Sequence, residues 1–242
     1  MELRLVEKVS LPDQVFQQLA AEIVSGRSKP GTTVPSERTL SETLAVNRHV
    51  VREALKRLEQ VGLVRITQGG GTKVLDFRRT AGLDLLAVVA ENGMAYEGVV
   101  PLFRSALEMR AGIGVDIARL CAERANGRLR RELAKLCDEI EAAAPGPDVL
   151  VVDQRFWQRL LDGADNLAYQ LAFNSLIRGV NALRELSVAW VLRELEQGDF
   201  RRPIARAIAD RDPAAAADAT RHALEPALEL LTTSAEPATG AG

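Results

Sequence analysis

A chain of 242 residues is long enough for two domains, each with a hydrophobic core of its own. Its net charge of −2 at pH 7 excludes a protein that coats nucleic acid through bulk positive charge. Apolar residues make up 47% of the chain but aromatic residues only 4%, and β-branched patterning fades after residue 80, which favours a mainly helical fold.

The first predicted element is a helix over residues 10–25. Val15, Leu19 and Ile23 share one face of this helix, and Gly26 provides its stop. We expect the helix to pack under the elements that follow it.

Residues 35–61 predict two short helices joined by a tight turn. The first begins at Ser36, whose hydroxyl can accept a hydrogen bond from a free N–H of the first turn, and it ends near Leu44. Asn47 is suited to cap the second helix. The buried stripe expected in that second helix consists of Val51, Ala54, Leu55, Leu58 and Val61.

The exposed side of the second helix carries positive charge at its start. Arg48, His49 and Arg52 oppose the helix macrodipole, which favours anions at this end by about 0.3–1 kcal/mol per charge. A nucleic acid can exploit the arrangement, because phosphates bind at the helix end while arginines reach base edges. The pattern therefore predicts a DNA-recognition helix. For this window alone, an ordinary amphipathic helix with a solvated basic face is the alternative.

A β-hairpin is predicted directly after the two helices. Residues 63–67 and 72–75 are β-branched runs on either side of a turn that contains Gln68, Gly69, Gly70 and Gly71. A helix-turn-helix followed by a hairpin is a winged helix.

These residues resemble a known family. Residues 11–74 are similar to the N-terminal domain of the GntR family of bacterial transcription regulators, in the segments PG-x3-PSER, VNR-x3-REAL-x2-L-x3-GL and GGGTKV. The resemblance implies that Arg38, Arg48 and Arg52 contact DNA. It also places Asn47 and His49 at the start of the recognition helix and Gln68 and Gly69 at the wing tip, with His49 replacing the small hydroxyl residue common there. Lys73, on the wing, is expected to contact a phosphate.

The two halves of the chain differ in charge. Residues 1–78 contain 12 lysines and arginines against 9 acidic residues, so the remainder has a net charge of −5. The basic excess lies with the predicted DNA-binding part. A DNA-packaging protein would need far more positive charge and would have no use for an acidic helical half.

From residue 82 onward, helical periodicity predicts a bundle of six or seven helices. They are expected over residues 82–90, 100–125, 129–143, 149–161, 167–195, 203–209 and 213–231, with a turn over 162–166. The predicted organisation is a DNA-binding domain over residues 1–76, a linker over 77–81, a helical effector-binding and dimerisation domain over 82–232, and a disordered tail over 233–242.

The helical part also resembles a family. The segments GLDLL, LEMRAGI and ARLCAERA and the closing I-x3-I-x3-D-x3-A pattern are similar to the FCD-type effector domain of the FadR subgroup of GntR regulators. Many such domains hold a divalent metal with one aspartate and three histidines. The corresponding positions here are Asp153, Trp157, Arg201 and Ala223, so the resemblance implies no metal, and no cofactor is expected.

Two interpretations of Asp153 follow. Either its carboxylate pairs with Arg201, or the pocket takes an acidic ligand directly, with Arg110 or Arg201 on the ligand carboxylate. In the second case the apolar lining is expected from Phe156, Trp157, Ala168, Ala172 and Gly179. A fatty acid or acyl-CoA suits this chemistry, and a small carboxylic acid is the alternative.

Cys121 and Cys137 fall inside helical patterns and are expected to be core thiols of a reducing compartment. No apolar run approaches the roughly 20 residues that span a bilayer, and the N-terminus has no signal-peptide pattern. We therefore expect a cytoplasmic protein without membrane contact.

The predicted function is a ligand-responsive transcription regulator of fatty acid metabolism. It is expected to be a homodimer that acts as a repressor on a palindromic operator in double-stranded DNA. Catalysis by the helical domain is the less favoured alternative, because the only histidines are His49 and His222 and no nucleophile with a nearby base can be assembled.

Overall fold

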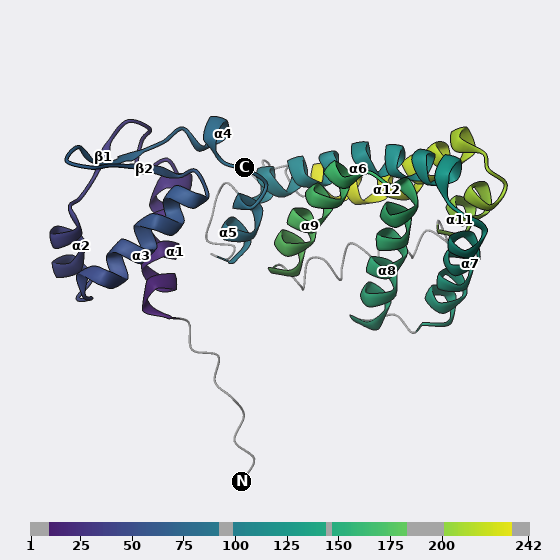
Figure 1. Ribbon diagram of the computed structural model, residues 1–242, viewed down its shortest axis with the longest axis horizontal. Coiled ribbons are helices and arrows are strands. Elements are labelled where there is room, and N and C mark those ends of the chain that lie inside the picture. The colour runs from purple at the N-terminus through teal and green to yellow at the C-terminus, as the bar shows by residue number, and fades with distance from the viewer. Residues whose placement is uncertain (1–9, 92–98, 144–146, 183–200, 234–242) are drawn as a thin grey trace, which may run out of the picture. The chain divides into compact units, whose positions relative to one another are not determined.

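The computed structural model describes residues 10–91, 99–143, 147–182 and 201–233 (Figure 1). Contacts divide the chain into two compact units, Met1–Val99 and Val100–Gly242. Among the described helices, none is both long and apolar enough to cross a membrane.

The first unit is a winged helix-turn-helix, as the sequence predicts. Its elements are α1 (Leu11–Val24), β1 (Thr33–Val34), α2 (Glu37–Thr43), α3 (Arg48–Gln60), β2 (Val64–Thr67), β3 (Gly71–Val74), α4 (Phe77–Thr80) and α5 (Leu85–Glu91). Both predicted caps are confirmed. Ser36 Oγ accepts a hydrogen bond from Thr39 N at 3.2 Å, and Asn47 Oδ1 accepts one from Val50 N at 3.0 Å.

The core of the first unit forms where α3 packs against α1 and α2. The predicted stripe of α3 is buried except for Val61, which caps the helix and is half-buried. On α1, Leu19 is also only half-buried, and the face toward the core contains Val15, Phe16, Ala20 and Ile23. A tightly packed α3 thus presents its polar side to solvent.

The sheet has three strands rather than the two of the predicted hairpin. Its order is β1-β3-β2, and both neighbouring pairs are antiparallel. The added strand pairs Thr33 with Lys73 and Val34 with Thr72. A two-residue strand carries no alternating pattern, so its pairing across about 40 positions leaves no local signal in the sequence.

The segment after the wing departs from a plain linker. Residues 77–80 form the short helix α4, and Thr80 Oγ1 donates a hydrogen bond to Gly62 O at 2.7 Å. Beyond it, α5 contacts α1 of the first unit. The boundary at residues 77–81 therefore stays a prediction.

The second unit is helical throughout its described part. Its helices are α6 (Val99–Arg124), α7 (Gly127–Ala142), α8 (Pro147–Ala164), α9 (Leu167–Ala182), α11 (Arg201–Ala209) and α12 (Pro213–Thr233). In Figure 1, α6 and α12 run across α7, α8 and α9. The residues predicted to extend the helix after Ala182 lie outside the described residues. The predicted disordered tail over 233–242 begins one residue too early, because Thr233 is the last residue of α12, and the rest of it also lies outside the described residues.

Helix α8 continues past the predicted turn. Asp162, Gly163 and Ala164 are helical, and the chain turns only at Asp165, which has φ 45°. Gly163 explains the difference, because it lets α8 cross α6 closely: a Cβ atom there would collide with Cys121 Sγ and the Leu129 side chain.

Burial raises the pKa of the Cys121 thiol to about 12. Cys121 and Cys137 are both buried and neither forms a disulfide, in agreement with core thiols.

We expect Gly163→Ala to lower the free energy of unfolding by about 1–3 kcal/mol, because the added methyl group overpacks the crossing of α6 and α8. Gly112→Ala in α6 is the matched control, since a Cβ there meets no atom within 4 Å. That control should raise stability by about 0.5–1 kcal/mol through helix propensity. Denaturant unfolding of both variants checks this, and equal effects would contradict the close crossing.

Candidate DNA-binding surface and effector site

The start of α3 brings together four of the residues predicted to bind DNA. Asn47 caps the helix, and Arg48, His49 and Arg52 are exposed on its first two turns. Arg38 is exposed on the neighbouring α2, where Nη1 lies 3.7 Å from Glu42 Oε1. The buried face of α3 fixes which way these side chains point. Cationic side chains and the N–H groups at a helix start can donate hydrogen bonds to phosphate oxygens and to base edges.

Arg52 has a partner that sequence reasoning missed. Its Nε donates to Glu37 Oε1 at 3.0 Å, and its Nη2 donates to Glu37 Oε2 at 2.7 Å. These bonds from Arg52, together with its charge, lower the pKa of the Glu37 carboxyl below its usual value. The two residues lie on different helices, so neither a motif nor a periodicity connects them.

The wing carries the remaining predicted contacts. Gln68 and Gly69 are exposed at the turn, where Gly69 has φ 76°. Lys73 is exposed on β3, and the strand register sets it opposite Arg65 on β2. Like charges directly opposite each other disfavour the free sheet, and a phosphate bound beside them would relieve this repulsion. Arg65 was not predicted, although alternation along residues 63–67 places it on the exposed side.

The predicted effector residues form two contacting groups in the second unit. Asp153 on α8 pairs with Arg201 on α11, with Oδ1 at 2.8 Å from Nε and 2.7 Å from Nη2. The pair is buried, with side-chain exposures of 5% and 1%. The first interpretation of Asp153, pairing with Arg201, is thus what the structure contains.

The second group of predicted effector residues consists of Trp157 and its neighbours Phe156 and Arg110. It is 3% exposed, and its ring meets that of Phe156 edge to face at a centroid distance of 6.4 Å. The Arg110 guanidinium lies 5.2 Å from the Trp157 ring centroid. Trp157 Nε1 is buried and donates no hydrogen bond within the described protein. A buried N–H of this kind normally has a partner, which a ligand or water can supply.

One predicted lining residue is misplaced. Ala168 is exposed on α9, so it cannot line an interior cavity, whereas Ala172 is half-buried and Gly179 is buried. The buried side of α9 also includes the larger side chains of Phe173 and Leu176.

The four positions that correspond to metal ligands do not fit a metal. Trp157 and Arg201 offer no lone pair to a cation, and Ala223 is buried without a ligand atom. The neighbouring His222 points away, with a side chain that is 80% exposed. Within the described ranges, no group of three His, Cys, Asp or Glu side chains could hold a metal ion.

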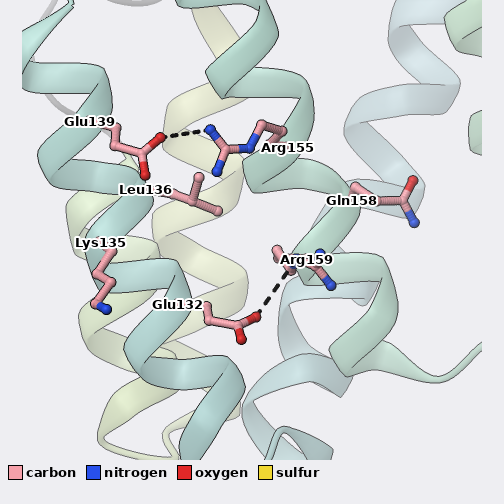
Figure 2. Close-up of a pocket in the computed structure, with 7 residues that line it drawn as sticks. All are labelled: Glu132, Lys135, Leu136, Glu139, Arg155, Gln158 and Arg159. Carbon is pink, nitrogen blue, oxygen red and sulfur yellow. Dashed lines mark hydrogen bonds and ion pairs between the residues drawn. The ribbon is translucent and has the colours of Figure 1, made fainter.

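Two surface hollows flank α8, and none of the five predicted effector residues lines either. One, of about 240 Å³, lies between α7 and α8. Figure 2 shows that both of its arginines are paired with glutamates of the facing helix: Arg155 donates to Glu139 at 2.7 Å, and Arg159 lies 3.8 Å from Glu132. The other, of about 340 Å³, lies between α8 and α9.

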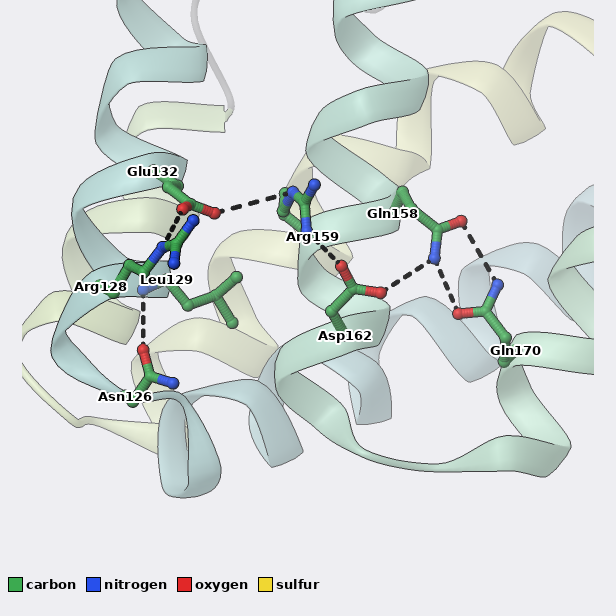
Figure 3. Close-up of polar contacts among 8 residues, drawn as sticks. All are labelled: Asn126, Arg128, Leu129, Glu132, Gln158, Arg159, Asp162 and Gln170. Carbon is green, nitrogen blue, oxygen red and sulfur yellow. Dashed lines mark hydrogen bonds and ion pairs between the residues drawn. The ribbon is translucent and has the colours of Figure 1, made fainter.

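A polar ladder then joins α8 to α9 (Figure 3). Gln158 donates to Asp162 at 3.1 Å and to Gln170 at 2.8 Å. Gln170 returns a hydrogen bond to Gln158 at 3.3 Å. These hydrogen bonds link α8 to α9, and the Asp162 carboxylate is already paired with Arg159. We therefore assign these residues to the stability of the helix pair and not to ligand binding.

Comparisons with known proteins match both units. Residues 11–74 match the family described as "Bacterial regulatory proteins, gntR family", and residues 105–226 match the "FCD domain". The HTH-type transcriptional regulator Mce2R of Mycobacterium tuberculosis is 37% identical over 231 residues, which cover 93% of each chain. A "Fatty acid metabolism regulator protein" of Serratia proteamaculans is 32% identical, over 71% of this chain and 70% of its own.

Among solved structures, "Streptococcus agalactiae GntR" shares 24% identity with a TM-score of 0.48, over 90% of this chain and 99% of its own. The two family matches, the winged helix and the exposed arginines of α3 agree with the resemblance read from the sequence. The chain belongs to the GntR family of bacterial transcription regulators and combines a winged helix-turn-helix with the FCD domain of its FadR subgroup.

Proposed function

We propose that this regulator is a homodimeric repressor that binds a palindromic operator and responds to an acidic apolar effector. The observation that carries the DNA-binding part is the cluster of Arg48, His49 and Arg52 on the solvent side of α3. We assign DNA binding to residues 1–76 and effector binding with dimerisation to residues 82–232, joined by the linker 77–81.

Selection from a pool of randomised duplexes tests the proposal. The wild-type chain should enrich sequences that contain two inverted half-sites, because a two-fold dimer presents two recognition helices to one duplex. Transcription from a promoter that carries the enriched site should fall when the protein is added. Enrichment of single, unrepeated half-sites would contradict the dimeric mode of binding.

Exposed apolar side chains on the helical unit support the proposed homodimer. Leu167, Leu171 and Val151 of α8 and α9 are large apolar side chains with exposures of 73%, 58% and 58%. Their burial against a second copy would remove apolar surface from water, which supports self-association through the helical unit. Sedimentation at micromolar concentration should therefore give twice the chain mass, and a stable monomer would contradict it.

Lys73 is proposed as a phosphate contact rather than a base reader. Lys73→Gln should weaken binding to all duplexes alike and lower the slope of log affinity against log salt by about 0.9 per lost phosphate contact. Lys135→Gln in α7 is the control, since it removes the same charge from an exposed site outside the winged helix. A sequence-dependent loss for Lys73→Gln would assign it a different role.

The effector is proposed to bind near Trp157. Its buried Nε1 supplies a donor for a ligand oxygen, and the half-buried Arg110 supplies positive charge on the same ring. Arg201 is a weaker candidate for the ligand carboxylate, because Asp153 already occupies its guanidinium edge. The names of the fatty acid regulators among the relatives support a fatty acid or acyl-CoA.

Ligand addition tests this assignment. A long-chain acyl-CoA or free fatty acid should raise the melting temperature and weaken binding to the enriched duplex, and Trp157→Phe should reduce both effects. A small carboxylic acid that acts at lower concentration would favour the alternative effector. If long-chain acyl ligands leave both measurements unchanged, or if a stoichiometric divalent ion is found, the proposed effector class is wrong.

A further inference from the structure

Glu37 and Arg52 form a two-point contact between the helices of the helix-turn-helix. Glu37 lies in the first turn of α2, and Arg52 lies in the second turn of α3. Each carboxylate oxygen accepts one N–H of the guanidinium, from Nε at 3.0 Å and from Nη2 at 2.7 Å. Both side chains remain accessible, with exposures of 35% and 55%.

The geometry of this contact leaves the reading edge of Arg52 available. A guanidinium has five N–H groups, and Glu37 uses the edge formed by Nε and Nη2. The hydrogen bonds that Arg52 makes to the described residues do not involve Nη1. The end-on edge, formed by Nη1 and the second N–H of Nη2, is one that can bind the O6 and N7 atoms of guanine. One carboxylate and one base can therefore hold the same guanidinium together.

We infer that Glu37 is a positioning residue that sets the sequence specificity of Arg52. The inference rests on the proposed DNA-binding function. The carboxylate holds the long arginine side chain in one orientation before DNA arrives, so less rotamer freedom is lost when the base is bound. It also neutralises the guanidinium and repels phosphates, so Arg52 gains little from a duplex that offers the wrong base.

Stability does not explain the pair. Ion pairs at this level of exposure contribute little to folding, so the variant Glu37→Gln should fold as the wild type does. Other contacts hold α3 in place. Its apolar stripe is buried, and its Arg57 pairs with Asp13 and lies over the Phe16 ring of α1. The function of Glu37 can therefore be tested in a folded protein.

The test compares three variants on two duplexes. The specific duplex is one that the wild-type chain enriches from a randomised pool, and the non-specific duplex is its scrambled sequence. Glu37→Gln removes the charge and one acceptor oxygen. Glu37→Asp keeps the charge but shortens the side chain by one methylene, so the two-point contact is lost. Glu42→Gln is the matched control on the same helix, because Glu42 meets Arg38 only at 3.7 Å.

We expect Glu37→Gln to lower the ratio of specific to non-specific affinity about tenfold, which is the size of one arginine–guanine discrimination. Non-specific affinity should rise, and substitution of the contacted guanine should no longer weaken binding by the wild-type factor. Glu37→Asp should lose the same discrimination while its non-specific affinity stays near the wild-type value. Glu42→Gln should raise both affinities slightly and leave the ratio unchanged.

Three outcomes would overturn the inference. If Glu37→Gln keeps the wild-type ratio, Glu37 does not set specificity. If Glu37→Asp behaves as wild type while Glu37→Gln does not, charge alone acts and positioning is wrong. If Glu42→Gln lowers the ratio as much, the effect belongs to the net charge of α2. A wild-type chain that enriches no sequence would instead overturn the proposed function and this inference with it.

Discussion

Asp153→Ala should lower the free energy of unfolding by about 3–5 kcal/mol, because it removes the buried carboxylate that contacts the buried Arg201 cation at two short distances. The expectation follows from the burial of this pair, with exposures of 5% and 1%, and from its two short contacts. Denaturant unfolding followed by circular dichroism measures the change. Arg201→Ala should be similarly costly, since it strands the carboxylate instead.

The double variant Asp153→Leu with Arg201→Met is the decisive control. Apolar side chains of similar size replace both charges, and such exchanges are often neutral or stabilising. Its stability should therefore exceed that of Asp153→Ala. If the double variant is as unstable as Asp153→Ala, then packing rather than an unbalanced buried charge causes the loss. A loss below about 1 kcal/mol for Asp153→Ala would place the pair in contact with water.

Arg52→Ala should abolish specific DNA binding while weak non-specific binding remains. A bidentate arginine–guanine contact discriminates by about 1–3 kcal/mol, and a dimer on a palindrome makes the contact twice. Affinity for the enriched duplex should then fall by about two orders of magnitude or more in a gel-shift or anisotropy titration. Arg48→Ala should act in the same direction, because Arg48 shares the exposed start of α3.

A matched arginine controls for the loss of charge. Arg27 is exposed in the same unit and pairs with Glu22 at 2.9 Å, but it lies outside the predicted DNA-binding surface. Arg27→Ala should change the affinities for specific and scrambled duplexes by similar small factors. An unchanged affinity of Arg52→Ala for the enriched duplex would rule out the proposed docking of α3.

Much of the winged helix could be predicted because its signals are local. The caps at Ser36 and Asn47 act within three residues, and the α3 stripe repeats with the helical period. The turn at Gly69 needs a positive φ, which its glycine supplies. Local chemistry of this kind specifies where helices begin, which face is buried and where a hairpin turns.

In the helical unit, local signals predicted some features correctly and missed others. Periodicity predicted the long α6. The family resemblance placed Asp153 and Arg201 at corresponding ligand positions, and one of the two interpretations drawn from it is the ion pair that the structure contains. The end of α8 was missed, because Gly163 has the local character of a turn residue. Only the neighbouring Cys121 and Leu129 side chains show why a glycine is needed inside that helix.

The sequence by itself thus determined the family, the winged helix and the solvent side of the recognition helix. Only the tertiary structure decided that Arg52 meets Glu37, that Lys73 faces Arg65 across the wing, and that Trp157 is buried beneath Arg110. The physical reason is common to all three. A contact between separate elements depends on the direction in which packing turns each side chain, and that direction leaves no periodic trace in the chain.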